Sequence, residues 1–190
     1  MSDRETKLED RARRFATAAH ARVGQVRKYT GEPYIVHPAA VVALVRSVDH
    51  TESMLAAAWL HDTVEDTDVE LSDIEREFGG KVASLVYWLT DVSRPEDGNR
   101  AERKALDRAH LAQSPMPAQT VKLADLIDNS RSIFRHDPNF ARVYLREKRQ
   151  LLEVMQEGDR LLRAEAFRLV EDYEERLRAD LRENPAILTA

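Results

Sequence analysis

Four side chains that can bind a metal ion or transfer a proton lie in the segment HDTVED, directly after the apolar run SMLAAAWL. They are His61, Asp62, Glu65 and Asp66. Imidazole and carboxylate groups bind divalent ions, and a carboxylate can also take a proton from water. Because His61 and Asp62 are neighbours, both can reach one ion only near a helix end or a kink. Helical spacing places Glu65 on the same face as His61, and Asp66 on the same face as Asp62. The segment therefore predicts two ligands close to an ion and two carboxylates further out.

The same segment also fits a structural role, because acidic residues after a helix can cap the next element or meet solvent. Two other stretches favour a metal site. In YIVHP, His37 stands in a proline-bounded loop just before a helix. In VKLADLIDN, Asp125 lies among apolar residues, where a carboxylate is costly unless it is paired or bound to a metal. Taken alone, His37 also fits a hydrogen-bonded loop histidine, and Asp125 a residue bonded to a neighbouring helix end.

Three motifs occur in order along the chain: RKYTGEPYIVHP (27–38), LHDTVEDT (60–67) and VKLADLIDN (121–129). Together they resemble the hydrolase domain of the RelA/SpoT family, and most closely its stand-alone form, the small alarmone hydrolases. These proteins belong to the HD-domain phosphohydrolases. The resemblance covers most of residues 10–157, and nothing in the chain resembles the synthetase half of the longer bifunctional members.

The resemblance implies an all-α fold, an HD-domain helical bundle with a C-terminal helical extension. It also implies one divalent metal ion, which is most often manganese. The ligands carried over from the motifs would be His37, His61, Asp62 and Asp125. Oxygen ligands with two imidazoles suit manganese or iron(II) better than calcium.

The resemblance further implies a reaction, the release of the 3′-pyrophosphate from (p)ppGpp or a related alarmone by attack of a metal-activated water. Glu65 and Asp66 match the acidic pair that activates or orients that water. Arg27 and Lys28 match a basic pair that contacts substrate, and Asn129 matches a residue that faces the nucleoside. The residues suit this chemistry, because a metal makes bound water acidic, a carboxylate can take the proton, and cations hold phosphate.

Two features depart from the family pattern. After Asp125, the usual basic residue is replaced by Leu126, and the usual aromatic residue by Asp128. An added carboxylate repels a polyphosphate unless it is turned away or paired, so Asp128 is expected to face solvent or to pair with Arg131 three residues on. The second departure is one extra residue between the Arg-Lys pair and GEPY.

These departures leave two alternatives open. One is an HD-domain phosphatase that acts on another nucleotide, such as NADPH or a nucleoside monophosphate. The other is a non-catalytic binding module that keeps the fold. Intact ligands and an intact acidic pair argue against the second, because a decayed site usually loses a ligand.

Composition limits the class of protein. The chain has 190 residues, 43% of them hydrophobic, which predicts one domain, or one domain with a helical tail. With the resemblance, this implies an HD-type hydrolase domain over 1–157 and a C-terminal helix over 158–190 that packs on it or extends from it. The net charge of −5, with no basic stripe, argues against nucleic acid as a partner and is compatible with a small nucleotide substrate. There is no cysteine, which excludes disulfides and thiolate catalysis. No apolar run approaches the ~20 residues that span a bilayer. We therefore expect a cytoplasmic protein with no membrane contact, and a homo-oligomer is left open.

The elements that must position these residues are expected to be helices. Gly is scarce, Ala, Leu, Arg and Glu are abundant, and β-branched alternation is almost absent. Residues 28–38 are predicted to form a loop. The predicted helices cover 5–24, 38–48, 51–62, 73–91 with a break near Gly79-Gly80, 99–112, a segment from 118 to about 135, and 139–182 with a break near Gly158.

Overall fold

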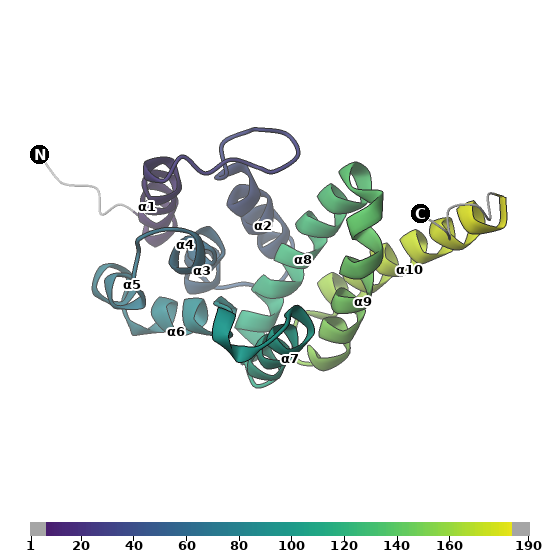
Figure 1. The fold of residues 1–190 in the computed structure, drawn as a ribbon. Coiled ribbons are helices and arrows are strands. Elements are labelled where there is room, and N and C mark those ends of the chain that lie inside the picture. The colour runs from purple at the N-terminus through teal and green to yellow at the C-terminus, as the bar shows by residue number, and fades with distance from the viewer. Residues whose placement is uncertain (1–6, 184–190) are drawn as a thin grey trace, which may run out of the picture.

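The structure, a computed structural model, describes residues 7–183. These residues form helices joined by turns and by one long loop between the first two helices (Figure 1). The elements in chain order are α1 (Leu8–Arg22), α2 (Val36–Arg46), α3 (Glu52–Leu60), α4 (Thr63–Asp66), α5 (Leu71–Phe78), α6 (Gly80–Leu89), the 3₁₀ helix η1 (Pro95–Asp97), α7 (Arg100–Leu111), α8 (Met116–His136), α9 (Pro138–Val154) and α10 (Arg160–Glu183).

The prediction of an all-α fold is confirmed. Within residues 7–183 the only β-type pairing is an isolated antiparallel bridge between Val26 and Pro33, which closes the loop between α1 and α2. Gly31 lies in this loop with φ of +70°, in the left-handed region that favours glycine. The bridge folds the loop back on itself, so that its end leads directly into α2.

Helix α3 lies at the centre of the N-terminal half. Every residue from Met54 to Leu60 is buried, as expected of a helix that is apolar on all sides. It packs against α1, α2, α6 and α8. Thr51 caps its start by accepting a hydrogen bond from the Met54 amide at 3.2 Å. Because α3 ends at Leu60, the His-Asp pair lies at the end of a buried helix.

Helix α8 crosses the middle of the molecule, with α1 to α6 on one side and α9 and α10 on the other (Figure 1). It packs against α2, α3 and α6, and also against α9 and α10. Its buried stretch from Ala118 to Ile127 includes Asp125. Helix α8 therefore carries a carboxylate into the region where α2 and the end of α3 meet.

Several helix boundaries differ from the predicted ones. Helix α2 begins at Val36, so His37 lies in its first turn and the expectation of a loop histidine is wrong. Pro38 did not delay the helix, because the first-turn amides of a helix need no intrahelical partner. The helix predicted over 51–62 ends at Leu60, and α4 starts after a break at His61 and Asp62. The predicted break at Gly79-Gly80 is confirmed as the junction of α5 and α6.

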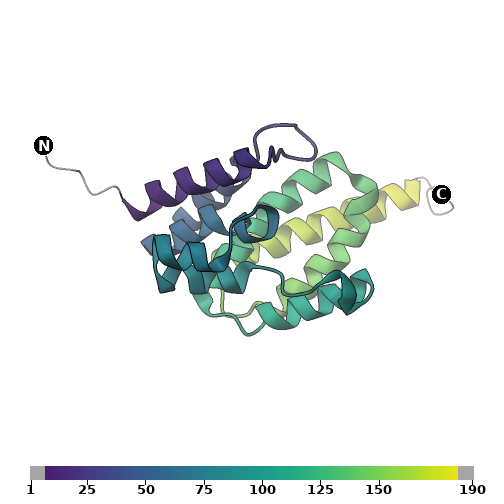
Figure 2. The ribbon, with the colours of Figure 1, turned by 60° about the vertical axis from the view of Figure 1, so that its left-hand side comes forward.

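The break predicted near Gly158 is also present, between α9 and α10. A Cβ at Gly158 would lie 2.6 Å from Leu123 Cδ1 and 3.2 Å from the backbone carbon of Gln119, so the turn packs tightly on α8. Gln119 Oε1 accepts hydrogen bonds from the amides of Glu157 and Gly158 at 2.9 and 3.2 Å. Figure 2 shows α10 running along α8.

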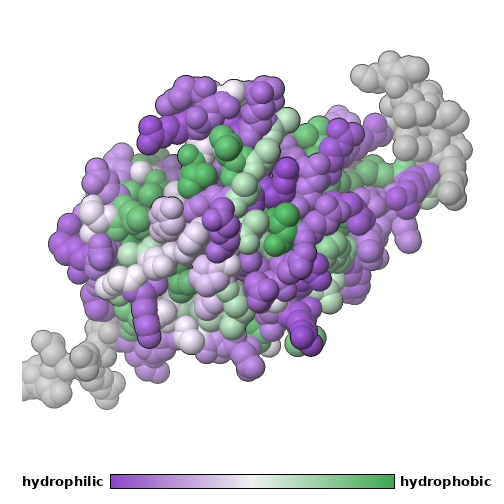
Figure 3. Space-filling model, turned by 90° about the horizontal axis from the view of Figure 1, so that it is seen from below, coloured by the Kyte–Doolittle hydropathy of each residue, from purple (hydrophilic) through white to green (hydrophobic). Residues whose placement is uncertain are grey.

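Helix α10 contributes Leu162, Ala166 and Val170 to the same buried cluster as α3 and α8. The division into 1–157 and 158–190 stays a prediction, and residues 1–6 and 184–190 lie outside the described part of the chain. In the view of Figure 3 the surface is mostly hydrophilic, and hydrophobic residues are scattered over it. No helix in residues 7–183 combines the length and apolar character that crossing a membrane requires.

Candidate metal centre

Three predicted ligands converge where α2 meets the junction of α3 and α4. His37, His61 and Asp62 each offer a donor atom within 4.8 Å of the other two. Asp62 Oδ2 lies 3.1 Å from His61 Nε2 and 3.6 Å from His37 Nε2. Two adjacent residues can face one point because the helix stops after Leu60 and restarts at Thr63.

Asp125, the fourth predicted ligand, approaches the same two imidazoles from α8. Its Oδ1 lies 3.2 Å from His37 Nε2 and 3.9 Å from His61 Nε2. The residue is 4% exposed. Helices far apart in the sequence thus bring two imidazoles and two carboxylates together.

The hydrogen bonds of the two imidazoles show that this donor set fits a cation. His61 Nδ1 lies 2.9 Å from the carbonyl oxygen of Ala58, which only accepts, so Nδ1 carries the proton. His37 Nδ1 lies 2.7 Å from the carboxylate of Asp128 and is a donor for the same reason. In the neutral rings both Nε2 atoms then present lone pairs, and they face each other at 3.3 Å. Such an arrangement requires a positive charge between the rings, either a proton or a metal ion.

The two carboxylates are held by neighbouring donors. The Tyr34 hydroxyl donates to Asp62 Oδ2 at 2.5 Å. Lys122 Nζ lies 2.9 Å from Asp125 Oδ2, and the Asn129 amide donates to Asp125 Oδ1 at 2.6 Å. Burial raises the pKa of Asp125, but the Lys122 ammonium and the imidazoles outweigh it and hold that pKa well below its usual range. The carboxylate therefore stays ionised, as a metal ligand must.

The imidazoles respond to the same charges. Burial lowers the pKa of His37, but its hydrogen bonds to Asp125 and Asp128 outweigh burial and raise the pKa to about 9. For His61, burial also lowers the pKa, and the charge of Asp62 raises it above its ordinary value. Without a metal, the site thus binds a proton tightly, which is the property expected of a site built for a cation.

The acidic pair Glu65 and Asp66 lies on α4, beside this cluster rather than in it. Glu65 is exposed at the surface, but its carboxylate is partly desolvated in the cleft, which raises its pKa to about 7, and Oε1 accepts a hydrogen bond from the amide of Asp91. Asp66 Oδ2 accepts from Gln25 Nε2 at 2.8 Å. Gln25 Oε1 in turn lies 2.6 Å from Nδ1 of the buried His20. Both carboxylates are therefore fixed by partners other than the two imidazoles.

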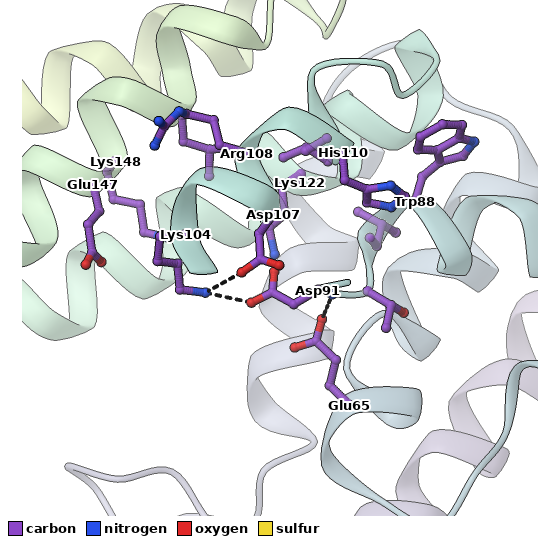
Figure 4. Close-up of a pocket in the computed structure, with 14 residues that line it drawn as sticks. Glu65, Trp88, Asp91, Lys104, Asp107, Arg108, His110, Lys122, Glu147 and Lys148 are labelled. Atoms are coloured by element: carbon purple, nitrogen blue, oxygen red, sulfur yellow. Dashed lines mark hydrogen bonds and ion pairs between the residues drawn. The ribbon is translucent and has the colours of Figure 1, made fainter. Parts of the chain in front are cut away.

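A cavity of about 90 Å³ opens beside Glu65, between the end of α6 and helices α7, α8 and α9 (Figure 4). Lys104 Nζ donates to Asp91 at 2.6 Å and to Asp107 at 3.3 Å across it. Among the described residues that line the cavity, Lys148 has no acidic partner, and its ammonium lies 4.7 Å from the ring centroid of Tyr144. Burial lowers the pKa of Lys148 to about 8. The cavity therefore holds an ammonium that an anion could pair with.

The predicted basic pair divides. Arg27 lies over the site and donates to Asp128 Oδ2 at 3.2 Å and to Asn129 Oδ1 at 3.4 Å. Lys28 turns the other way, toward Asp137 at 3.4 Å, and its side chain is 72% exposed. The structure therefore brings Arg27 and Asn129 to the cluster and leaves Lys28 outside it.

The expected surroundings of Asp128 were wrong. Its carboxylate faces His37 and Arg27, not solvent, and Arg131 pairs with Glu165 of α10 at 3.1 Å. Spacing along one helix suggested Arg131 as the partner of Asp128. The actual partners are Arg27, from the loop between α1 and α2, and His37, from α2.

Sequence reasoning also missed three residues that hold the site. Tyr34 and Gln25 bond to Asp62 and Asp66 across 28 and 41 positions, so no local spacing indicates them. The third is Lys122, three residues before Asp125 on the same helix. That spacing was a usable signal for an ion pair.

The HD-domain family model matches residues 12–154. The chain belongs to the HD-domain family. Membership implies a divalent metal, and the cluster of His37, His61 and Asp62 in this HD-domain chain fits one.

Relatives of this HD-domain chain carry related names. A probable guanosine-3′,5′-bis(diphosphate) 3′-pyrophosphohydrolase of Synechocystis is 40% identical over 72% of this chain and 18% of its own length. A protein of the same enzyme name from Drosophila melanogaster is 39% identical over 56% of this chain and 59% of its own. A solved structure, described as a metazoan orthologue of SpoT that hydrolyses ppGpp, is 28% identical. It matches with a TM-score of 0.77 over 90% of this chain and 98% of that one. The chain spans 18% and 14% of the first two curated relatives that it matches.

Proposed function

We propose that this protein is a metal-dependent phosphohydrolase that releases the 3′-pyrophosphate of (p)ppGpp or a related alarmone. The observation that carries the proposal is the geometry of His37 and His61, whose Nε2 lone pairs face each other between Asp62 and Asp125, with the Glu65 carboxylate on the neighbouring helix. The names of the relatives support the choice of substrate.

We assign His37, His61, Asp62 and Asp125 as the residues that hold the metal, and manganese as the metal. When bound, the ion supplies a Lewis acid that polarises a phosphoryl oxygen and makes water acidic enough to attack near neutral pH. Two imidazoles with two carboxylates form a donor set that suits manganese.

The remaining steps belong to side chains of this chain. Glu65, with its pKa near 7, takes the proton from the attacking water. Asp66, held by Gln25, orients that water. Lys148 pairs with a phosphate oxygen in the cavity next to Glu65, where none of the described residues supplies it with an acidic partner. Arg27 and Asn129 contact the nucleotide on the other side of the cluster, and Lys28 meets it only if the loop rearranges.

A second candidate is a phosphatase of the same family that acts on NADPH or a nucleoside monophosphate. It is favoured by one contact, the bond between Arg27 and Asp128, because a cation already paired with a carboxylate offers less attraction to a highly charged polyphosphate.

We further propose that the protein acts in the cytoplasm, where nucleotides of these classes occur. Its proposed partner is a small nucleotide and not a nucleic acid.

The deciding experiment is turnover of a panel of ppGpp, pppGpp, ppApp, NADPH and nucleoside monophosphates, with and without Mn²⁺. Manganese-dependent release of pyrophosphate from a 3′-pyrophosphate nucleotide supports the alarmone hydrolase and identifies the nucleobase of its substrate. Release of orthophosphate from NADPH or a monophosphate alone would transfer the protein to the second candidate. The Glu65→Ala variant serves as the background control. If every substrate is left intact, the proposal of a hydrolase fails.

A further inference from the structure

Asp128 is the residue of this site that the resemblance does not explain, since an aromatic residue is usual at its position. It lies on α8, one helical turn after Asp125, and its side chain is 22% exposed. Its Oδ2 accepts a hydrogen bond from His37 Nδ1 at 2.7 Å and another from Arg27 at 3.2 Å. Both partners come from outside α8, so the carboxylate links three segments of the chain.

The bond to His37 controls which nitrogen faces the metal centre. A carboxylate only accepts, so it fixes the proton on Nδ1 and leaves the lone pair of Nε2 directed at Asp62 and His61. His37 is 1% exposed, so water does not replace Asp128 as the partner of Nδ1. His61 obtains the same orientation from a backbone carbonyl, which is fixed by α3 itself. His37 depends on a side chain instead.

Asp128 is in turn held by Arg27, and the contacts among these side chains form a closed circuit. Arg27 also donates to Asn129, which donates to Asp125 at 2.6 Å, and Asp125 Oδ1 lies 3.2 Å from His37 Nε2. The closed circuit of contacts therefore runs from His37 through Asp128, Arg27, Asn129 and Asp125 back to His37. A closed set of partners restricts each side chain more than a single bond would.

We propose that Asp128 is a positioning residue for the metal centre: it orients His37 and makes its imidazole a stronger ligand, while Arg27 holds the Asp128 carboxylate in place. Carboxylate partners of ligating histidines typically change metal affinity by about 10- to 100-fold. The inference rests on the metal centre of the proposed function and is independent of its substrate.

Isothermal titration of the purified full chain with Mn²⁺, in the absence of any nucleotide, tests the proposal. Asp128→Ala is expected to weaken Mn²⁺ binding by about 10- to 100-fold. Asp128→Asn keeps an oxygen that can accept from Nδ1 and is expected to recover part of the loss. The visible spectrum of bound Co²⁺ should shift in Asp128→Ala and return toward wild type in Asp128→Asn. A change that only loosened the fold would not follow this order.

Asp137→Asn is the matched control, because Asp137 also pairs with a residue of the basic loop, Lys28, but lies away from the imidazoles. Its amide oxygen can still cap α9 by accepting from Phe140, so the fold is kept. This variant should bind Mn²⁺ as wild type does. Wild-type affinity in Asp128→Ala, or equal losses in both Asp128 variants and in Asp137→Asn, would overturn the proposal. A protein that binds Mn²⁺ in this order but hydrolyses nothing would keep this inference and lose the proposed function.

Discussion

At the residue scale, Asp62 and Glu65 lie three positions apart and have different surroundings. Asp62 faces both imidazoles, and the His61 charge and hydrogen bond hold its pKa below the usual range against the effect of burial. Glu65 accepts a hydrogen bond from a backbone amide, and desolvation of its carboxylate raises its pKa. Titratable groups with opposed pKa shifts in one site commonly have separate roles.

Replacing each residue should separate those roles. Asp62→Ala is expected to abolish Mn²⁺ binding and activity together, because it removes a donor that faces both imidazoles. Glu65→Ala is expected to abolish activity while Mn²⁺ stays bound. Calorimetric titration and a phosphate-release assay measure the two properties. Loss of the metal from the Glu65 variant would show that Glu65 is a ligand and not the base.

The raised pKa of His37 predicts a pH dependence of metal binding. The ring is protonated below a pKa of about 9, whereas a metal needs the free lone pair of Nε2, so binding must release that proton. Affinity for Mn²⁺ should therefore rise by about tenfold per pH unit toward that pKa and level off above it. Calorimetry in buffers of different ionisation enthalpy should find about one proton released near neutral pH. Release of none would mean that the imidazole is already neutral.

Lys148 gives a prediction about substrate. Lys148→Met keeps much of the apolar stem and removes the ammonium, so it should lower kcat/KM by about 10- to 100-fold, the effect of losing a charge-assisted hydrogen bond. Metal affinity should not change. Lys81→Met, an exposed lysine on α6, is the control. Equal kcat/KM in the two variants would remove Lys148 from the proposed site.

Sequence alone could predict which residues come together at the candidate site, but not the residues that hold them there. His61 and Asp62 were predictable because adjacency and the spacing to Glu65 are local properties. Asp128 was not, since its partners His37 and Arg27 lie 91 and 101 positions away. Such contacts arise from the packing of helices and have no periodicity in the sequence.

At the element scale, the site depends on where helices begin and end. Glycines made the junction of α5 and α6 predictable. The end of α3 was predicted two residues late, at 62 instead of Leu60, because no glycine or proline marks the break at His61 and Asp62. In the structure the Thr63 hydroxyl donates to the Leu60 carbonyl at 2.7 Å, at the position of the break. The break gives the adjacent His and Asp a common direction.

The start of α3 offers a test at this scale. Thr51→Ala removes the side-chain acceptor of the Met54 amide and should lower the free energy of unfolding by about 1 kcal/mol. Thr17→Ala, an exposed position within α1, should cause no comparable loss. Chemical denaturation of the metal-free proteins measures both. An unchanged Thr51 variant would indicate that packing alone fixes the start of α3.

At the scale of the whole molecule, α10 shares its core with the rest. Leu162, Ala166 and Val170 are buried together with residues of α3 and α8. The amphipathic pattern predicted the helix, and Gly158 predicted the break before it, but the packing of the helix depends on the close approach of Gly158 to α8, which a sequence pattern does not reveal. Whether residues 158–190 form a separate unit stays open to experiment.

Gly158→Ala addresses this question. The added methyl group would meet Leu123 and the backbone of Gln119, so we expect a loss of about 1–3 kcal/mol in stability. A single unfolding transition at lower temperature would mean that α10 folds with the domain, and a new separate transition would mean that it does not. Gly80→Ala is the control, because its Cβ would have only an ordinary contact, 3.7 Å from Glu75.

The closed set of contacts that joins His37 to Arg27 has a thermodynamic consequence for the order of events in the proposed reaction. A phosphate that draws Arg27 away removes the support of Asp128, so occupancy of the nucleotide site and the strength of cation binding become linked. Such linkage is reciprocal: the factor by which an anion on Arg27 weakens the cation is the factor by which the cation weakens that anion. In the proposed reaction, the bound ion would therefore weaken the hold of Arg27 on the product nucleotide. The product would leave while the ion stays in place, as repeated turnover requires.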